Sequence, residues 1–182
     1  MEDASIQEPR AGSLRLARAA DAADIAAVTI DGLRSYAEWS PGWQLDAPPP
    51  SSDAWLGSTL ARPDVWWLVS CEPETGAVVG HVSLAHTTTL DREAVDGRVQ
   101  LWQLFVTRPF WGSGVADQLL TNAIATATDR GYEQLTLWTP NGASRAKRFY
   151  ERAGLVRTGQ RRHDSRLGLS AVEYKLALQS KA

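Results

Sequence analysis

Cysteine, long apolar runs and net charge are all scarce in this chain of 182 residues. Its one cysteine, Cys71, excludes an internal disulfide, and no Cys/His spacing typical of a zinc site is present. The longest apolar stretch, around Val65–Val69, is far shorter than the roughly 20 residues that span a bilayer, and the N-terminus lacks the apolar segment of a signal peptide. The net charge of −2 offers no general attraction to nucleic acid or to an anionic membrane. We therefore expect a cytoplasmic protein that binds neither nucleic acid nor membranes.

The overall composition is that of an ordinary globular protein. Hydrophobic residues make up 43% of the chain and charged residues 22%, and the length fits one domain. Residues 1–12 are polar and predict a disordered tail, which leaves 13–182 as a single domain. The eight tryptophans are an unusually high number, compatible with a substrate cleft, although tryptophan is more often a core residue.

The spacing of apolar residues predicts alternating strands and helices. Helical spacing indicates helices over 21–36, 54–61, 115–130 and 143–153. Strands are expected over 14–17, 65–70, 77–85, 99–106, 134–139, 156–161 and 171–178, with long loops over 39–52 and 86–97. The order predicts an α/β (α+β) fold, in which about four helices flank a mixed, mostly antiparallel sheet of six or seven strands. The helix over 115–130 should connect two parallel strands.

A glycine-rich turn joins the predicted strand over 99–106 to the helix over 115–130. It has the sequence Trp111-Gly-Ser-Gly114-Val-Ala116. The first backbone N–H groups of a helix have no partner within it, and the helix dipole makes that end positive, so small residues there admit a phosphate. We expect a pyrophosphate over residues 112–117. The alternative is a plain tight turn that needs glycine for its positive φ.

Two common phosphate motifs do not fit this turn. A Walker A loop ends in Gly-Lys-[Ser/Thr], which is missing here. The dinucleotide fingerprint G-x-G-x-x-G/A is matched by Gly112 and Gly114, but Asp117 occupies its third position. The turn also follows several predicted antiparallel strands, unlike the first turn of a Rossmann fold.

The turn resembles the coenzyme motif of the GNAT superfamily of N-acetyltransferases, [Gln/Arg]-x-x-Gly-x-[Gly/Ala]. A second segment, from Arg145 to Leu155, is similar to the family's A-x-x-F-Y-E-x-x-G-F stretch. Residues 14–17 followed by Asp21, and Val78-Val79-Gly80-His81, look like the family's first and third strands. The resemblance therefore extends over nearly the whole chain.

This resemblance implies an N-acetyltransferase that uses acetyl-CoA as cosubstrate and needs no metal. The acetyl group would pass to a primary amine of a small molecule or peptide by direct attack in a ternary complex. In this family the fourth and fifth strands splay apart, and pantetheine pairs with the fourth strand at the positions of Leu104, Phe105 and Val106. The pyrophosphate would lie on Gly112, Ser113, Gly114, Val115, Ala116 and Asp117. Relatives are often dimers, so a homodimer is an expectation.

Tyr150 matches the family's general acid near the coenzyme sulfur. A phenol with a pKa of about 10 can protonate a departing thiolate. The alternative is a tyrosine whose ring packs on the sheet. Two positions depart from the family: Trp111 replaces the usual Arg or Gln, and Ala143 replaces a frequent Asn. Asn141 is then the substitute coenzyme ligand, although Asn-Gly is also a common turn pair.

The general base is not identified by the resemblance. Gln103 lies near the position where many members carry Glu, and an amide cannot accept the proton at neutral pH. The candidates are a water molecule or one of Asp96, His81, His86, His163 and Glu173. This gap keeps open an alternative function, a catalytically weak CoA-binding or protein-interaction module with the same fold.

The acceptor pocket is expected from the parts that least resemble the family, residues 36–56 and 86–97. These parts and the neighbouring strand carry several aromatic residues, Tyr36, Trp39, Trp43, Trp55 and Trp102. Such a set favours an apolar or cationic acceptor, or else packs beneath the proline-rich loop. A hydroxyl acceptor stays a third possibility, because a fold does not determine one function.

Overall fold

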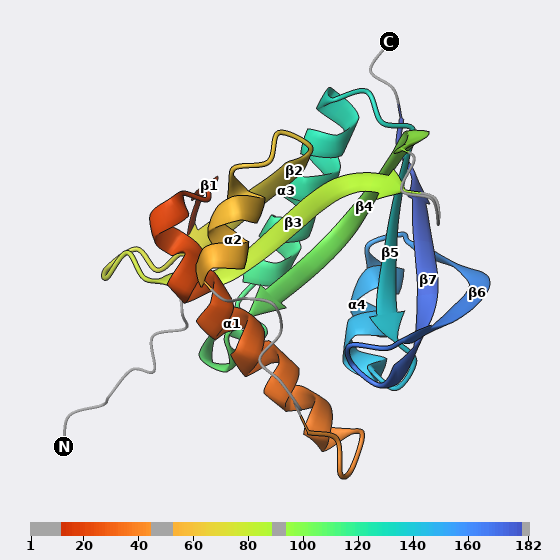
Figure 1. Cartoon of the computed structure of the whole chain (residues 1–182), viewed down its shortest axis with the longest axis horizontal. Helices are drawn as coiled ribbons and strands as arrows, with labels where there is room; N and C mark the ends of the chain where they lie inside the picture. Colours follow the sequence, from red (N-terminus) through yellow and green to blue (C-terminus); the bar gives the residue numbers. More distant parts are fainter. Residues whose placement is uncertain (1–11, 45–52, 89–93, 180–182) are drawn as a thin grey trace, which may run out of the picture.

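The computed structural model describes residues 12–44, 53–88 and 94–179, with side chains for 12–44, 56–87 and 95–179. Its strands are β1 Ser13–Leu16, β2 Val65–Cys71, β3 Val78–Thr88, β4 Ala94–Val106, β5 Gln134–Pro140, β6 Val156–Asp164 and β7 Leu169–Ala177. Its helices are α1 Ala22–Arg34, α2 Asp53–Leu60, α3 Val115–Asp129 and α4 Ser144–Arg152, with short 3-10 turns η1 Ala19–Asp21, η2 Ser35–Glu38 and η3 Arg108–Phe110. Figure 1 shows their arrangement.

The strands form one seven-stranded sheet in the order β1-β2-β3-β4-β5-β7-β6. Every neighbouring pair is antiparallel except β4 and β5, which are joined through α3 and run parallel. Helices α1 and α2 cover one face, and α3 and α4 cover the other (Figure 1). The predicted fold is therefore confirmed, including its mostly antiparallel sheet and its parallel crossover.

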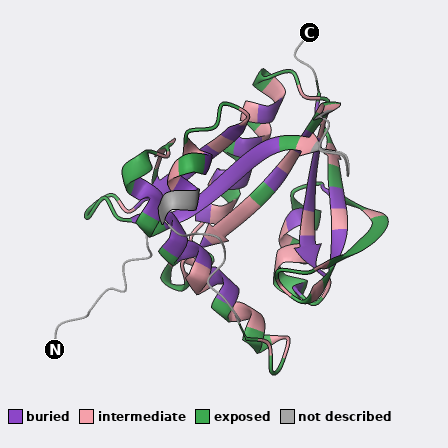
Figure 2. Cartoon of the chain, in the orientation of Figure 1, coloured by how far each residue is buried: buried purple, intermediate pink, exposed green. Residues whose placement is uncertain are grey.

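Each face of the sheet has its own apolar core (Figure 2). On the α3 face, the stripe of α3 at helical spacing is buried from Val115 to Ala127, together with Leu101 of β4 and Tyr174 of β7. On the α1 face, Ile25 and its helical neighbours pack on β2 and β3. These two cores explain why β2 and β3 are buried almost throughout: both of their faces are covered.

The strands next to the predicted 86–97 loop are longer than the sequence predicted. Strand β3 continues to Thr88 and β4 begins at Ala94, so much of that loop is hairpin, while residues 89–93 lie outside the described part. The polar pattern misled the prediction because this end of the hairpin is solvent-exposed, as His86 shows. Threonine is a good strand residue even where nothing apolar needs burial.

Asp21 does not cap α1 through its side chain, as the sequence suggested. Its carboxylate accepts two hydrogen bonds from the Arg15 guanidinium, at 2.7 and 2.8 Å, and one from the Arg18 backbone N–H. These partners, the Arg15 guanidinium first, lower the pKa of Asp21. The residue therefore ties β1 to the turn that precedes α1.

Candidate active site

Strands β4 and β5 separate halfway along β4. They pair only from Arg98 with Gln134 to Leu101 with Leu137, whereas β4 continues to Val106 and β5 to Pro140. Past Leu101, the edge of β4 toward β5 has no strand partner among the described residues, because the two strands diverge (Figure 1). The expected splaying of these two strands is confirmed.

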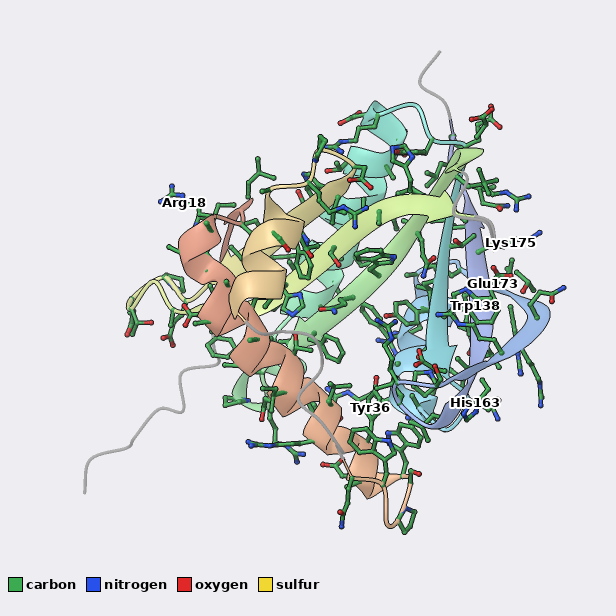
Figure 3. All side chains as sticks on the ribbon, viewed as in Figure 1. Arg18, Tyr36, Trp138, His163, Glu173 and Lys175 are labelled. Carbon is green, nitrogen blue, oxygen red and sulfur yellow. The ribbon has the colours of Figure 1, made fainter. Side chains whose placement is uncertain are left out.

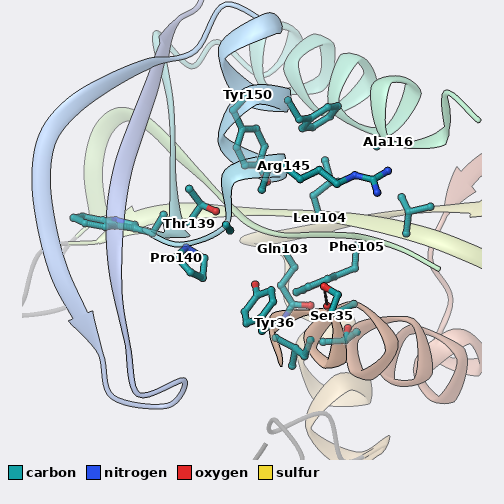
Figure 4. Close-up of a pocket in the computed structure, with 18 of the residues that line it drawn as sticks. Ser35, Tyr36, Gln103, Leu104, Phe105, Ala116, Thr139, Pro140, Arg145 and Tyr150 are labelled. Carbon is teal, nitrogen blue, oxygen red and sulfur yellow. Dashed lines mark hydrogen bonds between the residues drawn. The ribbon is translucent and has the colours of Figure 1, made fainter. Parts of the chain in front are cut away.

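A β-bulge lies where the gap begins. Ser83 of β3 pairs with Gln103 and the next residue, Leu84, pairs with Leu101, so Trp102 is the extra residue. Because one added residue exchanges the two faces of a strand, Phe105 then packs on the α1 side. Gln103 lies beside Ser35 and Tyr36 in Figure 4.

The gap opens into a cleft of about 1090 Å³, at the upper end of the size range for small-molecule sites. One wall consists of β4, the glycine turn and α4. The other consists of η2 and the β6–β7 turn (Figure 4). Most of the predicted site residues line it: Leu104, Phe105, Val106, Gly112, Gly114, Ala116, Asp117 and Tyr150.

Three predicted site residues do not line the cleft. The Ser113 hydroxyl donates to the Phe110 carbonyl at 2.6 Å, and Val115 is fully buried beneath the turn. The Asn141 side chain accepts a long hydrogen bond of 3.5 Å from Arg157. Any contribution of these residues to ligand binding would come from their backbone or from a rearrangement.

The glycine turn has the geometry of an anion site. Gly112 and Gly114 have φ of +83° and +87°, a left-handed conformation that other residues adopt at a cost of about 1–2 kcal/mol. A Cβ atom on either glycine would meet nothing within 4 Å, so the space above the turn is open. No side chain caps the start of α3, which leaves its first N–H groups available to a ligand.

Helix α4 adds positive charge that the sequence analysis missed. Arg145, Arg148 and Arg152 line the same cleft. Their spacing of three and four residues would have placed them on one helix face, which is the signal that could have found them. The Arg145 guanidinium lies 4.3 Å from the Trp111 ring, and Trp111 donates to the Val106 carbonyl at 2.7 Å. Trp111 therefore stacks on a cation at the position where the resemblance led us to expect Arg or Gln.

Tyr150 projects from α4 into the cleft (Figure 4). Its ring packs against Phe149 at 5.3 Å and Tyr174 at 6.3 Å, and its hydroxyl has no hydrogen-bond partner among the described residues. Burial raises the pKa of Tyr150, with a smaller contribution from Tyr36. The phenol is therefore protonated at neutral pH and carries an O–H that can donate a hydrogen bond.

Aromatic residues close the opposite side of the cleft. Tyr36, Trp39 and Trp102 line it, as predicted for the acceptor pocket, and Trp138 of β5 joins them. Figure 3 labels Tyr36 and Trp138 on the two sides of the gap. Trp43 does not line it but donates through Nε1 to the carbonyl of Leu167 in the β6–β7 turn, at 2.8 Å. The side chain of Trp55 lies outside the described residues.

Trp39 crosses to the β5–α4 turn. A Cβ atom built on Gly142 would lie 2.3 Å from Cε3 of Trp39, so the indole rests directly on the glycine backbone. The segment after α1 thus contacts the β5–α4 turn through Trp39 and the β6–β7 turn through Trp43.

None of the side chains considered as the general base lines the cleft. Burial lowers the pKa of His81 to about 3, and its Nε2 is 2.9 Å from the Thr29 hydroxyl. His86 contacts the Tyr132 hydroxyl, and Glu173 accepts a hydrogen bond from Thr158 at 2.7 Å. His163 and Asp96 are exposed.

The carboxylates that do line the cleft are Glu38, Asp117 and Asp164. Glu38 forms an ion pair with Arg108. Asp164 is only 15% exposed, and its Oδ1 accepts the backbone N–H groups of Arg166 and Leu167. Sequence reasoning missed Asp164 because it predicted the strand to end at Arg161.

Metal-binding clusters and membrane-spanning helices are both absent from the described residues. They contain no group of three or more His, Cys, Asp or Glu residues able to hold a metal ion. No helix among them is long and apolar enough to cross a bilayer.

Known proteins resemble this chain in sequence and in fold. The family model described as "Acetyltransferase (GNAT) family" matches residues 33–155. N-acetyltransferase 8B of Homo sapiens is 28% identical over 95 residues, which span 52% of this chain and only 40% of that protein. An N-acetyltransferase from Staphylococcus aureus Mu50 has a TM-score of 0.71 at 18% identity, covering 92% of this chain and 99% of its own. The PaiA N-acetyltransferase from Thermoplasma acidophilum, solved in complex with coenzyme A, has a TM-score of 0.69 at 15% identity, covering 90% and 98%.

Proposed function

Because this chain belongs to the GNAT acetyltransferase family, we propose that it transfers the acetyl group of acetyl-CoA to a primary amine in a ternary complex. One observation carries the proposal. The unpaired edge of β4, the open glycine turn and the Tyr150 hydroxyl all border one continuous cleft. A cosubstrate with a pyrophosphate, a pantetheine arm and a thioester needs these three features within one cleft.

The coenzyme would bind mainly to backbone. The amides of pantetheine would pair with Leu104, Phe105 and Val106 as an added strand, which is how extended ligands use an open sheet edge. The pyrophosphate would accept N–H groups of residues 112–117, including that of Val115, and Arg145 and its neighbours on α4 would add charge. The N–H of Ser113 would join them only after leaving the Phe110 carbonyl, to which it donates at 3.3 Å. Asn141 would reach the coenzyme only after leaving Arg157.

The proposed reaction begins when the acceptor ammonium loses one proton to solvent. The neutral nitrogen attacks the thioester carbonyl carbon, and a β4 backbone N–H stabilises the oxyanion that forms. The new C–N bond persists and the C–S bond breaks. The nitrogen loses its second proton, and Tyr150 donates a proton to the departing thiolate before being reprotonated. The products are the N-acetylated acceptor, CoA and one released proton. Holding both substrates in one cleft supplies much of the rate.

Calorimetry with acetyl-CoA, with CoA and NADPH as comparison ligands, tests the cosubstrate. A thiol-release assay with a panel of primary amines tests the transfer. Binding in the micromolar range together with turnover would support the proposal. Binding without turnover on any amine would favour the CoA-binding module instead, and no binding would refute the coenzyme site. A cytoplasmic location and a homodimer stay predictions.

The coenzyme site itself has a matched pair of variants. Gly114→Glu and Gly131→Glu both place a side chain at positive φ, +87° and +80°, at opposite ends of α3, and neither Cβ meets an atom within 4 Å. Both variants should therefore lose similar stability. Only Gly114→Glu should abolish acetyl-CoA binding, by blocking and repelling the pyrophosphate. Equal affinity of the two variants for acetyl-CoA would refute the assignment of the pyrophosphate to this turn.

A further inference from the structure

The cleft contains an arginine that the coenzyme does not need. Arg162 of β6 lines the half of the cleft opposite the glycine turn. Its guanidinium lies 4.4 Å from the ring of Trp138. Within the described part of the chain it forms no ion pair or hydrogen bond. A stacked guanidinium keeps its edge free to bind a carboxylate with two hydrogen bonds.

The sheet register explains why Arg162 points into the cleft. Arg162 pairs with Ala171 of β7, Ala171 pairs with Pro140 of β5, and Trp138 lies two residues earlier on β5. All of these residues are on the same face, because paired residues and alternate residues of a strand share a face. Arg162 is exposed as a whole, and partial burial lowers the pKa of its guanidinium, whereas Asp164 and Glu173 favour the charged form and Arg166 opposes it.

An opposite charge lies two residues further along the same strand. Asp164 faces the same side as Arg162, with the two Cα atoms separated by about 6.6 Å. The two side chains form no ion pair with each other in the described structure, and Asp164 keeps Oδ2 free while Oδ1 accepts two backbone N–H groups. Asp164 Oδ1 also lies 4.0 Å from Nε of the exposed Arg166, a long ion pair that leaves Oδ2 open. The cleft therefore presents a cation, Arg162, and an anion, Asp164, on the same face of one strand.

This pair of charges is within reach of the reaction centre. Asp164, Tyr36 and Tyr150 all line this cleft. Burial first, and then the negative charge of Asp164, raise the pKa of Tyr36. An amine held by Asp164 and Tyr36 would lie between the β6–β7 turn and the Tyr150 hydroxyl.

We propose that the acceptor is a small zwitterion, an amino acid or a close derivative, whose ammonium binds Asp164 and whose carboxylate binds Arg162. The aromatic walls of Tyr36, Trp39 and Trp102 would cover its side chain. This inference rests on the proposed function for the identity of the reacting amine. It narrows the acceptor from any primary amine to one that carries a nearby carboxylate.

The test uses matched acceptors that differ only in the carboxylate: L-phenylalanine with phenethylamine, and L-leucine with isoamylamine. In the thiol-release assay, the amino acid of at least one pair should have a kcat/KM about tenfold or more above that of its amine. Arg162→Gln should abolish this preference by raising KM for the amino acid alone. Arg161→Gln, one residue away on the opposite face, should change neither the preference for the amino acid nor its KM. Asp164→Asn should weaken both members of a pair, since both carry the ammonium.

A binding measurement separates failure of this inference from failure of the proposed transfer. Protein saturated with CoA, which has no acetyl group to give, is titrated with the same four compounds by calorimetry. Binding of an amino acid that Arg162→Gln abolishes would support the zwitterion site even if no turnover were found. The inference would be overturned if the wild-type protein used or bound both members of each pair equally. It would also be overturned if Arg162→Gln weakened the binding of the amino acid and of its amine by the same factor. Failure of all four compounds to bind the CoA-saturated protein would overturn it as well.

Discussion

Gly32 of α1 lies against the ring of Phe105, on the strand that is proposed to hold pantetheine. A Cβ atom at Gly32 would be 2.3 Å from Cδ1 of Phe105, which no real contact tolerates. Gly32→Ala must therefore push the Phe105 ring away from α1. In the wild-type protein this ring also packs against His81, with 5.8 Å between the two ring centroids. Since Phe105 lines the cleft, the displaced ring would enter it.

Two effects compete in this variant. Replacing glycine by alanine within a helix stabilises the protein by about 0.5–1 kcal/mol. Overpacking at a close contact destabilises it by about 1–3 kcal/mol. The contact should dominate, with a net loss of about 0.5–2 kcal/mol. With a urea m-value of about 2 kcal/mol per M, the midpoint of unfolding should fall by about 0.3–1 M. Acetyl-CoA affinity should fall about fivefold, equivalent to about 1 kcal/mol.

Gly57→Ala in α2 is the matched control, because a Cβ atom there meets nothing within 4 Å. It should be as stable as the wild type or more so. Adding Phe105→Leu to Gly32→Ala should restore part of the stability, giving a coupling energy of about 0.5 kcal/mol or more in a double-mutant cycle. If Gly32→Ala behaved like Gly57→Ala in urea and bound acetyl-CoA normally, the packing argument for Phe105 would be refuted.

The other predictions concern chemistry, specificity and pH. Tyr150→Phe should lower kcat about 100-fold or more with acetyl-CoA affinity unchanged in calorimetry; an unchanged rate across pH would remove Tyr150 from the mechanism. Gly142→Ala should displace Trp39 and raise KM for the acceptor several-fold, which corresponds to about 1 kcal/mol, while acetyl-CoA binding stays unchanged. Loss of acetyl-CoA binding with an unchanged KM for the acceptor would contradict the role of Trp39 in acceptor binding. Burial lowers the pKa of His81 to about 3 from its ordinary 6.5, so the unfolded chain binds the extra proton. The contribution of neutral His81 to the free energy of unfolding is fully present above pH 6.5. It should decline as the pH falls toward 3, by up to about 1.4 kcal/mol per pH unit. In urea titrations at several pH values, His81→Gln should remove this part of the pH dependence of stability, and the control His163→Gln should retain it. An equal pH dependence in the two variants would show that His81 is not the group responsible.

Much of the coenzyme half of the cleft was predictable because it is local in sequence. The end of β4, the glycine turn and the start of α3 form one continuous stretch, from Leu104 to Asp117. A helix N-terminus with free N–H groups follows from neighbouring residues alone, and so does the buried stripe of α3. Tyr150 was identified from a second short motif, by its resemblance to the family.

The proposed acceptor half was predictable only in part: Tyr36, Trp39 and Trp102 were expected there, whereas Trp138, Arg162 and Asp164 were not. Its side chains come from η2, β4, β5 and β6, and the hydrogen bond from Trp43 to Leu167 joins residues 124 positions apart. Only the sheet order, with β7 between β5 and β6, brings Arg162 onto Trp138. The bulge at Trp102 adds a change of face that alternation of apolar residues does not reveal.

The amino-acid sequence by itself determined which segments become strands and helices, where the helices bury their apolar faces, and where an open glycine turn precedes a helix N-terminus. These properties depend on residues within a few positions of one another. Tertiary structure alone decided that His81 is a neutral core residue, that Phe105 depends on Gly32, and that Asp164 and Arg162 share the cleft with Tyr150. Burial and charge are properties of what surrounds a group, and for these groups the surroundings come from distant parts of the chain.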